Sequence, residues 1–197
     1  MTGKGSLNHN SRKFHAKNTD PNRTHWNVEY CNEDIKDVYH ELFDDALKRY
    51  NDKQTRKDRK IDDYYEKIRS GKQEKLFHEV ILQIGDKDNM GSETMEGQLA
   101  AKILDEYMKG FQERNPTLRV FAAHLHLDEA TPHLHIDFIP YVTGSKRGLD
   151  TRVSLKQALS SLGFKGGSRS ETELNQWVQS EKEKLAMVMR GNEIEWD

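Results

Sequence analysis

The stretch from His124 to Asp137, which reads HLHLDEATPHLHID, decides how this chain folds. Apolar and polar residues alternate on both sides of a short loop at 128–132, over residues 118–127 and 133–141. Because successive side chains of a strand point to opposite faces of a sheet, this period of two predicts two strands. The short loop, which ends in proline, predicts that the two strands form an antiparallel hairpin.

Three histidines converge in this predicted hairpin. His133 and His135 share one face of the second strand, and His126 comes beside them when the hairpin closes. Packing does not explain the pattern, because valine or isoleucine would fill a sheet face better than imidazole. Three nitrogen ligands leave coordination positions open, as in a catalytic metal site. Neutral nitrogen ligands favour manganese, zinc, nickel or cobalt over magnesium.

Four other polar residues lie close to the three histidines in the sequence. His124 is farther from the turn, and we expect it to be a neighbour of the metal rather than a ligand. Asp137 fits either a carboxylate that orients an imidazole or a solvated strand end. Asp128 is expected to form the turn. Glu129 has no role in the turn, so we assign it a function, as a general base or in orienting a nucleophile.

The rest of the sequence predicts an α+β fold with a largely antiparallel sheet, because few strands and several helices occur in mixed order. Residues 1–27 are polar and indicate a loop, while strands are expected at 28–30 and 76–84. Apolar residues at helical spacing predict helices from Asn32 or Asp34 to about Tyr50 and over residues 58–69, 96–114, 154–162 and 171–189.

The composition is that of an ordinary globular protein. The 197 residues suit one domain, and 34% of them are hydrophobic and 32% charged. Cys31 is the only cysteine, which excludes an intrachain disulfide. The sequence has no apolar run near the ~18 residues of a membrane span and no signal peptide at its start, so we expect a cytoplasmic protein.

The net charge of −2 argues weakly against a nucleic-acid partner, but the charges are unevenly distributed. Basic residues gather in three runs, at 4–23, 48–60 and 146–169. A nearly neutral protein can therefore still carry a basic groove. Solvated helix faces are an equally good interpretation of the middle run.

At this point the motifs resemble those of a known family. The run from His126 to His135 resembles the HxDE…PHxH motif of Mob/Pre (MobV-type) plasmid mobilization and recombination relaxases, which are HUH endonucleases. Residues 9–12 (HNSR) are similar to the first motif of the family, HxxR, and residues 22–29 (NRTHWNVE) are similar to its second. The three motifs occur in the family's order and cover roughly residues 9–140.

The resemblance implies a fold and a reaction. The fold is a central antiparallel sheet of about five strands flanked by helices, with a catalytic domain at 1–165 and a C-terminal helical extension of it at 166–197. The reaction is a site-specific nick in single-stranded or hairpin DNA at a plasmid or mobile-element transfer origin, followed by rejoining. It proceeds by metal-assisted transesterification, with the protein left covalently on the 5′ phosphate, in the bacterial cytoplasm.

The chain departs from the family pattern at both ends. The family has a strand before its first motif, whereas only eight, mostly polar, residues precede His9, so we expect this edge strand to be missing or the start to be truncated. The family also carries a long helical C-terminal region for dimer or membrane contacts. We therefore interpret the chain as an excised catalytic domain, whose homodimer would form through a region absent here.

The resemblance also implies a role for each matching residue. The histidines at 126, 133 and 135 would hold a divalent metal, Mn²⁺ in the first place and Mg²⁺ or another transition metal in the second. His9 would be the nucleophile, Glu129 the acid beside it, and Arg12 a phosphate contact. The residues expected to bind single-stranded DNA are Arg12, Lys13, Lys17, Arg23, Trp26 and Asn27.

Three alternatives remain open at this stage. The first is a rolling-circle replication initiator or transposase with the same histidine site and a tyrosine nucleophile, for which Tyr64 and Tyr65 are the candidates. The second is a non-catalytic, metal-stabilised DNA-binding module, and the third is a hydrolytic metalloenzyme acting on a small substrate. A covalent adduct on a labelled oligonucleotide would separate the strand-transferase from the last two.

Overall fold

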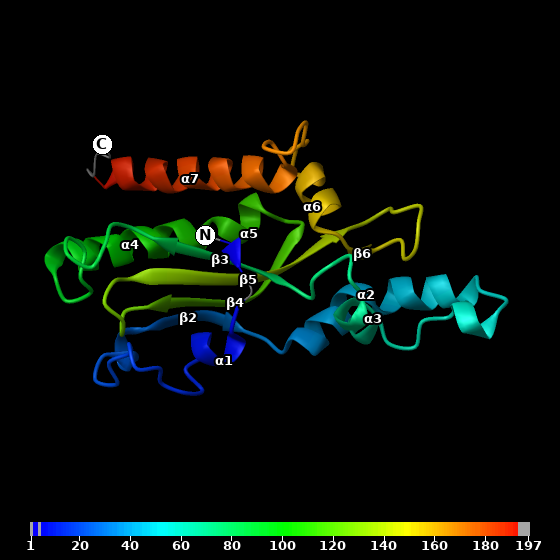
Figure 1. Cartoon of the computed structure of the whole chain (residues 1–197), viewed down its shortest axis with the longest axis horizontal. Helices are drawn as coiled ribbons and strands as arrows, with labels where there is room; N and C mark the ends of the chain where they lie inside the picture. The colour runs from blue at the N-terminus through cyan, green and yellow to red at the C-terminus, as the bar shows by residue number, and fades with distance from the viewer. Residues whose placement is uncertain (1, 4, 193–197) are drawn as a thin grey trace.

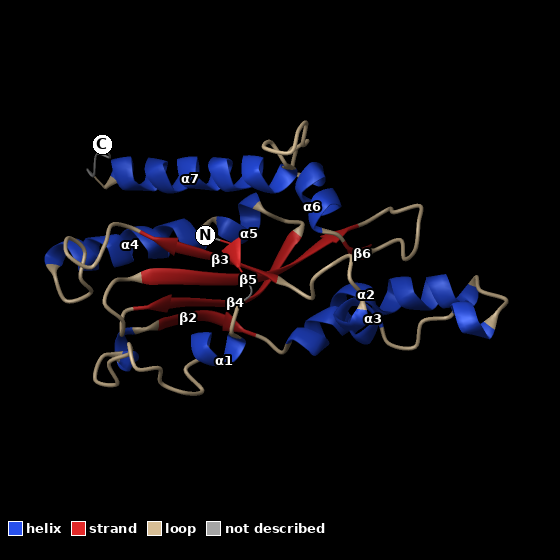
Figure 2. Cartoon of the chain, in the orientation of Figure 1, coloured by secondary structure: helices blue, strands red, loops and turns tan. Residues whose placement is uncertain are grey.

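Strand β5 lies inside an antiparallel sheet that has helices on both faces (Figures 1 and 2). The computed structural model describes residues 2–3 and 5–192. Within them the strand order is β1-β3-β5-β4-β2, and β6 pairs with the end of β5. The strands span Thr2–Gly3 (β1), Val28–Asn32 (β2), His78–Gln83 (β3), Leu118–His126 (β4), His133–Val142 (β5) and Arg152–Val153 (β6).

The predicted α+β fold is confirmed, and so is the hairpin at its centre. Strands β4 and β5 pair in antiparallel register, with His126 opposite His133 and His124 opposite His135. The helices span Leu7–Asn10 (α1), Ile35–Asp52 (α2), Tyr64–Ser70 (α3), Met95–Lys109 (α4), Phe111–Arg114 (α5), Leu155–Ser161 (α6) and Glu173–Gly191 (α7), with short 3₁₀ turns at Thr24–Trp26 and Lys57–Arg59.

The alternation along β5 divides the interior into two clusters. Leu134, Ile136 and Phe138 point to one face of the sheet and pack with α4 and α7. Ile139 points to the other face and packs with α2 and α3. Because side chains two apart in a strand share a face, His133 and His135 lie on the α2 side of the sheet. The histidine site is therefore bordered by a core cluster on its own face and supported by a larger one behind it.

Two parts of the structure differ from the sequence-based expectation at the N-terminus. The edge strand does exist, because Thr2 and Gly3 pair with Val80 and Glu79 of β3. Residues 7–10 form the single turn α1 instead of a loop. The polar composition of this segment hid both features, since neither strand nor helix here shows an apolar periodicity.

Two predicted helices are shorter than expected. Helix α3 begins at Tyr64 rather than at Asp58, because Asn51 holds Ile61 in place by hydrogen bonds to its N–H (2.9 Å) and carbonyl (2.8 Å). The predicted helix 96–114 is divided at Gly110 into α4 and α5, and glycine is a poor helix former.

Helix α7 lies against α4 and α6 and shares the larger core cluster with the sheet (Figure 1). Trp177 is fully buried, and its indole N–H donates to Asn115 Oδ1 at 2.9 Å. The division into 1–165 and 166–197 stays a prediction, and its last residues, 193–197, lie outside the described part of the chain.

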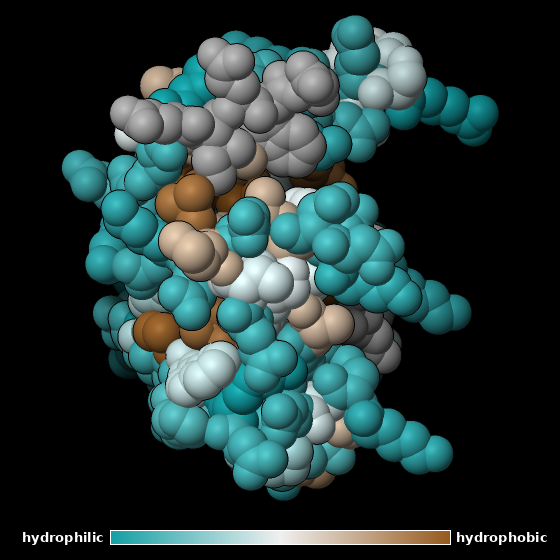
Figure 3. Space-filling view, turned by 90° about the vertical axis from the view of Figure 1, so that its left-hand side faces the viewer, coloured by the Kyte–Doolittle hydropathy of each residue, from teal (hydrophilic) through white to brown (hydrophobic). Residues whose placement is uncertain are grey.

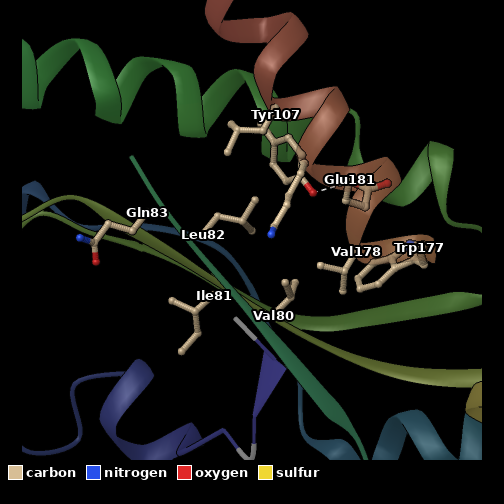
Figure 4. Close-up of a pocket in the computed structure, with 10 residues that line it drawn as sticks. Val80, Ile81, Leu82, Gln83, Tyr107, Trp177, Val178 and Glu181 are labelled. Carbon is tan, nitrogen blue, oxygen red and sulfur yellow. Dashed lines mark hydrogen bonds between the residues drawn. The ribbon is translucent and has the colours of Figure 1, made fainter. Parts of the chain in front are cut away.

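A cavity of about 300 Å³ lies between β3, α4 and α7 (Figure 4). Its wall includes Val80, Trp177 and the hydrogen-bonded pair Tyr107 and Glu181 (2.5 Å). None of the predicted site residues lines it. The face of the molecule seen in Figure 3 is mostly hydrophilic, with apolar residues only in small patches. No helix within residues 2–3 and 5–192 is long and apolar enough to cross a membrane.

We predict that Trp177→Ala lowers the free energy of unfolding by roughly 3–5 kcal/mol, because it leaves a cavity in the shared core. Urea denaturation followed by circular dichroism measures this difference. Met187→Ala is the matched control, since Met187 is 55% exposed on the same helix and its loss should change the stability by less than about 0.5 kcal/mol. An unchanged stability of the Trp177 variant would show that α7 folds apart from the sheet.

Candidate metal centre and nucleophile

Three histidines from the two central strands face one another on the sheet. One ring nitrogen from each of His126, His133 and His135 lies within 4.8 Å of the others. His126 Nδ1 and His135 Nε2 are buried and have no hydrogen-bond partner within the described residues. Buried polar atoms rarely remain unpaired, so this arrangement fits an ion bound between the three rings.

The other nitrogen of each ring fixes which tautomer is present. His126 Nε2 lies 2.8 Å from the carbonyl oxygen of Asn10, and His133 Nδ1 lies 2.9 Å from that of Thr131. A carbonyl only accepts, so the proton sits on those nitrogens and the lone pairs of His126 Nδ1 and His133 Nε2 face inward. Burial lowers the pKa of His126 to about 3, which keeps its ring neutral and able to bind a metal.

The carboxylate that orients His135 is Glu79, not Asp137. Glu79 Oε2 lies 3.1 Å from His135 Nδ1, while Asp137 sits beside Glu79 and receives a hydrogen bond from Asn10 (3.2 Å). Burial and the neighbouring negative charge of Glu79 raise the pKa of Asp137, so the two carboxyl groups share a proton. The sequence does contain a signal for Glu79, because it is the one acid in β3 and stands next to three apolar residues.

His124 is a neighbour of the three histidines rather than one of them. Its Nε2 lies 3.2 Å from Glu29 Oε2 on the adjacent strand β2, and its ring nitrogens are not among the three that lie within 4.8 Å of one another. Among the described residues, only the three histidines at 126, 133 and 135 form a cluster that fits a metal ion. The structure therefore brings together the predicted ligand set and separates His124 from it.

Helix α1 places His9 next to this cluster. The rings of His9 and His126 are 6.1 Å apart, and His9 Nε2 lies 3.4 Å from Glu129 Oε1. The same Glu129 oxygen lies 3.5 Å from His133 Nε2. Burial and the charge of Arg12 lower the pKa of His9, so its ring is neutral at neutral pH. Glu129 thus stands between the candidate nucleophile and the inward-facing nitrogens.

Glu129 is ionised in this environment. Burial acts to raise its pKa, but the adjacent His133 ring and the guanidinium of Arg12 outweigh that effect and lower the pKa to about 2. Asn18 Nδ2 also donates to its second oxygen at 2.7 Å. A carboxylate held in this way stays charged and can stabilise a positive ring beside it.

Arg12 is held by carboxylates of the chain itself, and its contact with a phosphate stays a prediction. Its guanidinium donates to both oxygens of Asp128 (2.9 and 2.5 Å), to Glu129 (2.8 Å) and to the carbonyl oxygen of His9 (2.9 Å). Its side chain is only 7% exposed, and its backbone is in the left-handed region with a φ of 54°. The bidentate pair with Asp128 holds that uncommon conformation in place.

Asp128 is likewise not a simple turn residue. It is fully buried and also accepts a hydrogen bond from Thr24 Oγ1 (3.1 Å), and its own carbonyl accepts from the N–H of Asp20 (2.7 Å). Asp128 therefore joins the hairpin to two separate parts of the N-terminal segment. Sequence reasoning missed this because the partners lie more than a hundred residues away.

The predicted DNA-binding residues fall into two groups. Arg23 donates to Asp20 and to the carbonyl oxygens of Leu127 and Glu129, while Asn27 accepts from backbone N–H groups of the hairpin, so both hold the fold together. Lys13, Lys17 and Trp26 are exposed. Phe14, which the sequence analysis did not single out, is 51% exposed, and its ring lies 5.9 Å from that of His9.

The alternative nucleophiles lie elsewhere. Tyr64 is buried in the cluster under α2, and its hydroxyl accepts from the N–H of Val153 at 3.0 Å. Tyr65 packs its ring against Tyr39 beneath the ammonium of Lys36. Both tyrosines thus belong to the packing of α2 and α3 rather than to the histidine site.

Fold and site together define the class, an α+β protein whose central hairpin carries three clustered histidines that could hold a metal, with a fourth histidine, His9, beside them. The sequence profile of Mob_Pre, described as plasmid recombination enzyme, matches residues 5–193, and the chain therefore belongs to this family. A comparison with curated proteins gave no match. The predicted resemblance to Mob/Pre relaxases is confirmed.

The chain is also similar to solved structures of the MobM relaxase domain (MOBV; Mob_Pre) bound to 22-nucleotide oriT DNA of plasmid pMV158. One is a Mn-bound crystal structure at pH 5.5, with 25% identity and a TM-score of 0.51, and the match covers 97% of this chain and 80% of that chain. Another, at pH 4.6, has 23% identity and a TM-score of 0.48, with the same coverage. The family and the first structure support a plasmid relaxase function, that of a DNA-nicking enzyme.

We predict that Asp128→Ala lowers the free energy of unfolding by about 3 kcal/mol, because it leaves the buried guanidinium of Arg12 without its main partner. Thermal and urea denaturation measure the change, and trypsin should cleave residues 12–23 faster. Thr24→Val, which removes only one hydrogen bond to Asp128, is the control and should cost about 1 kcal/mol. Equal stability of Asp128→Ala and the parent would contradict the anchoring role of this ion pair.

Proposed function

We propose that this chain nicks and rejoins single-stranded DNA at a plasmid or mobile-element transfer origin, by metal-dependent transesterification through His9. One observation carries the proposal, namely that Glu129 Oε1 lies 3.4 Å from His9 Nε2 and 3.5 Å from His133 Nε2. A nucleophile and a metal-binding set thus adjoin one carboxylate. The similar MobM domain is bound to origin DNA and manganese, which supports the same substrate and cofactor here.

The chain's own residues account for the activation of His9. Glu129 Oε1 lies 3.4 Å from His9 Nε2, and Arg12 Nη1 lies 3.3 Å from the same nitrogen. With the proton on Nε2, the ring donates to Glu129 and the Nδ1 lone pair is free to attack phosphorus. Arg12 directs its Nη1 group to the carbonyl oxygen of His9 and so holds α1 next to the carboxylate. The ring becomes positively charged on attack, and the ionised Glu129 stabilises that charge.

The transfer step keeps the free energy of the cleaved phosphodiester bond in the covalent bond between protein and DNA. A bond forms between His9 nitrogen and phosphorus while the bond from phosphorus to the 3′ oxygen breaks. The electron pair leaves on that oxygen, which takes a proton from solvent. The free 3′-hydroxyl later attacks the same phosphorus and displaces His9, so that neither water nor ATP is consumed.

His126, His133 and His135 would hold the divalent metal, for which Mn²⁺ is the first candidate. Bound there, the ion would supply positive charge that polarises the scissile phosphate. The two inward-facing nitrogens without partners and the outward-facing protons fit this ion better than they fit a structural hydrogen-bond network.

The surface next to His9 suits a single strand. Phe14 and Trp26 are exposed aromatic residues on which bases can stack, and Lys13 and Lys17 are exposed cations that can track phosphates. Because Arg12, Arg23 and Asn27 are engaged in the fold, we assign the DNA contacts to the four exposed residues. Action in the bacterial cytoplasm and formation of a homodimer are also part of the proposal.

The decisive experiment traps the covalent adduct on a short origin-derived single strand with Mn²⁺ present. We predict an adduct on the peptide that contains His9, lost on acid treatment because a phosphoramidate is acid-labile. His9→Ala should abolish the adduct while the protein stays folded. Tyr64→Phe is the control and should leave the adduct intact. An acid-stable adduct on the peptide that contains Tyr64 would instead identify a tyrosine nucleophile and overturn the His9 assignment.

The exposed lysines make a prediction about the salt dependence of binding. Replacing Lys13 and Lys17 by Gln should weaken single-strand binding and reduce the log–log slope against salt by about 0.7 per lysine. Fluorescence anisotropy over a range of KCl concentrations measures the slope. Lys182 and Lys184, exposed on α7, are the matched pair whose replacement should leave it unchanged. Equal slopes for both double variants would remove Lys13 and Lys17 from the interface.

A further inference from the structure

Asn10 directly follows the candidate nucleophile and points the other way, into the sheet. Its side chain is almost fully buried, with 2% of the residue exposed. The amide Nδ2 donates to Glu79 Oε2 at 2.5 Å and to Asp137 Oδ2 at 3.2 Å. Its backbone carbonyl accepts from His126 Nε2 at 2.8 Å. One residue of α1 therefore contacts β3, β4 and β5.

These contacts lead to two of the three metal-facing rings. His126 is bonded to Asn10 directly, and the bond fixes the proton on Nε2 so that Nδ1 faces the other histidines. His135 is reached through Glu79, because the same Oε2 atom that accepts from Asn10 also lies 3.1 Å from His135 Nδ1. The orientation of both rings thus depends on where α1 sits.

The chemistry of the place suits asparagine in particular. Two carboxyl groups face the side chain, and one amide NH₂ group carries two protons, one for each of them. Aspartate would bring a third carboxyl group into the same buried space. The backbone at Gly5 packs directly against the two carboxyl groups, since a Cβ on Gly5 would lie 2.7 Å from Asp137 Oδ1 and 2.8 Å from Glu79 Oε2. The space around the two carboxyl groups is therefore tightly filled.

We propose that Asn10 is a positioning residue that couples the seating of the His9 helix to the assembly of the metal centre. The inference rests on the proposed function for the identity of the metal site. When α1 is seated, Asn10 holds His126 and His135 in the geometry that binds the ion. By linkage, the bound ion then stabilises the seated position of α1, and with it the position of His9. Binding of the metal and placement of His9 are therefore thermodynamically coupled.

The test measures Mn²⁺ binding to the whole chain by isothermal titration calorimetry, without DNA. Asn10→Ala should weaken Mn²⁺ affinity by about 10- to 100-fold, the range for groups that orient a ligand. Asn10→Asp should weaken it at least as much, because the substituted carboxylate cannot donate to Glu79. Asn8→Ala, an exposed asparagine on the same helix, is the control and should bind Mn²⁺ like the parent.

A second readout follows the helix rather than the metal. Mn²⁺ should slow tryptic cleavage at Arg12 and Lys13 in the parent and in Asn8→Ala, and should give little protection in Asn10→Ala. In nicking assays at saturating Mn²⁺, the Asn10 variants should lower kcat by a larger factor than they raise the KM for the oligonucleotide, because Asn10 itself is buried away from the DNA surface. Asn10→Ser, which keeps one donor, covers the case in which the alanine variant fails to fold, and it should show an intermediate loss of affinity.

The result that overturns the proposal is an Asn10 variant that binds Mn²⁺ and protects residues 12–13 as the parent does. Alanine variants of His126, His133 and His135 separate this failure from a failure of the proposed function. If the histidine variants lose Mn²⁺ and the folded Asn10 variants do not, only the coupling is wrong. If the histidine variants also keep Mn²⁺, the metal site itself is wrong and the proposed function fails with it.

Discussion

The antiparallel register of β4 and β5 is the constraint on which the rest of the site depends. It places His126 opposite His133 and leaves His135 one pair farther along the same face. A slip by one residue would turn the histidines of β5 into the core and bring Leu134 to the surface. The apolar residues that alternate with the histidines prevent this slip, because they fill the cluster under α4 and α7. Core packing on one face therefore fixes the chemistry on the other.

The hairpin supplies the metal ligands, but the nucleophile reaches them only through tertiary contacts. Asp128 at the hairpin tip holds Arg12, and Arg12 in turn holds the carbonyl oxygen of His9. On the opposite side of α1, Asn10 bonds to His126. The one-turn helix has too few residues to be stable alone, so these contacts determine its position. This division explains why a polar N-terminal segment without regular periodicity can carry a catalytic residue.

The contrast between the local hairpin pattern and the tertiary contacts of α1 also determines how much could be predicted from the sequence. The hairpin and its three inward-facing histidines follow from a period of two, which is a local pattern. The assignment of Asp128 to a turn was wrong and its pairing with Arg12 was missed, because an ion pair between residues 116 apart leaves no trace in local sequence. The roles assigned to Glu79 and Phe14 likewise depend on their neighbours in the fold. Glu79 lies beside His135, and Phe14 lies beside His9. Glu129 was singled out because it has no role in the turn, and His9 only by the family resemblance; their catalytic roles stay predictions.

The charges around the site give a physical reason for a divalent ion. Asp128 and Glu129 are ionised, and the Glu79–Asp137 pair keeps one negative charge because it shares a proton. Arg12 balances one of these three charges, which leaves two uncompensated beside the place where a phosphodiester must approach. His126 and His9 offer no compensation, since burial lowers the pKa of both rings. A divalent ion between the rings would cancel the two remaining charges, and without it the carboxylates would repel the negatively charged substrate from the nucleophile.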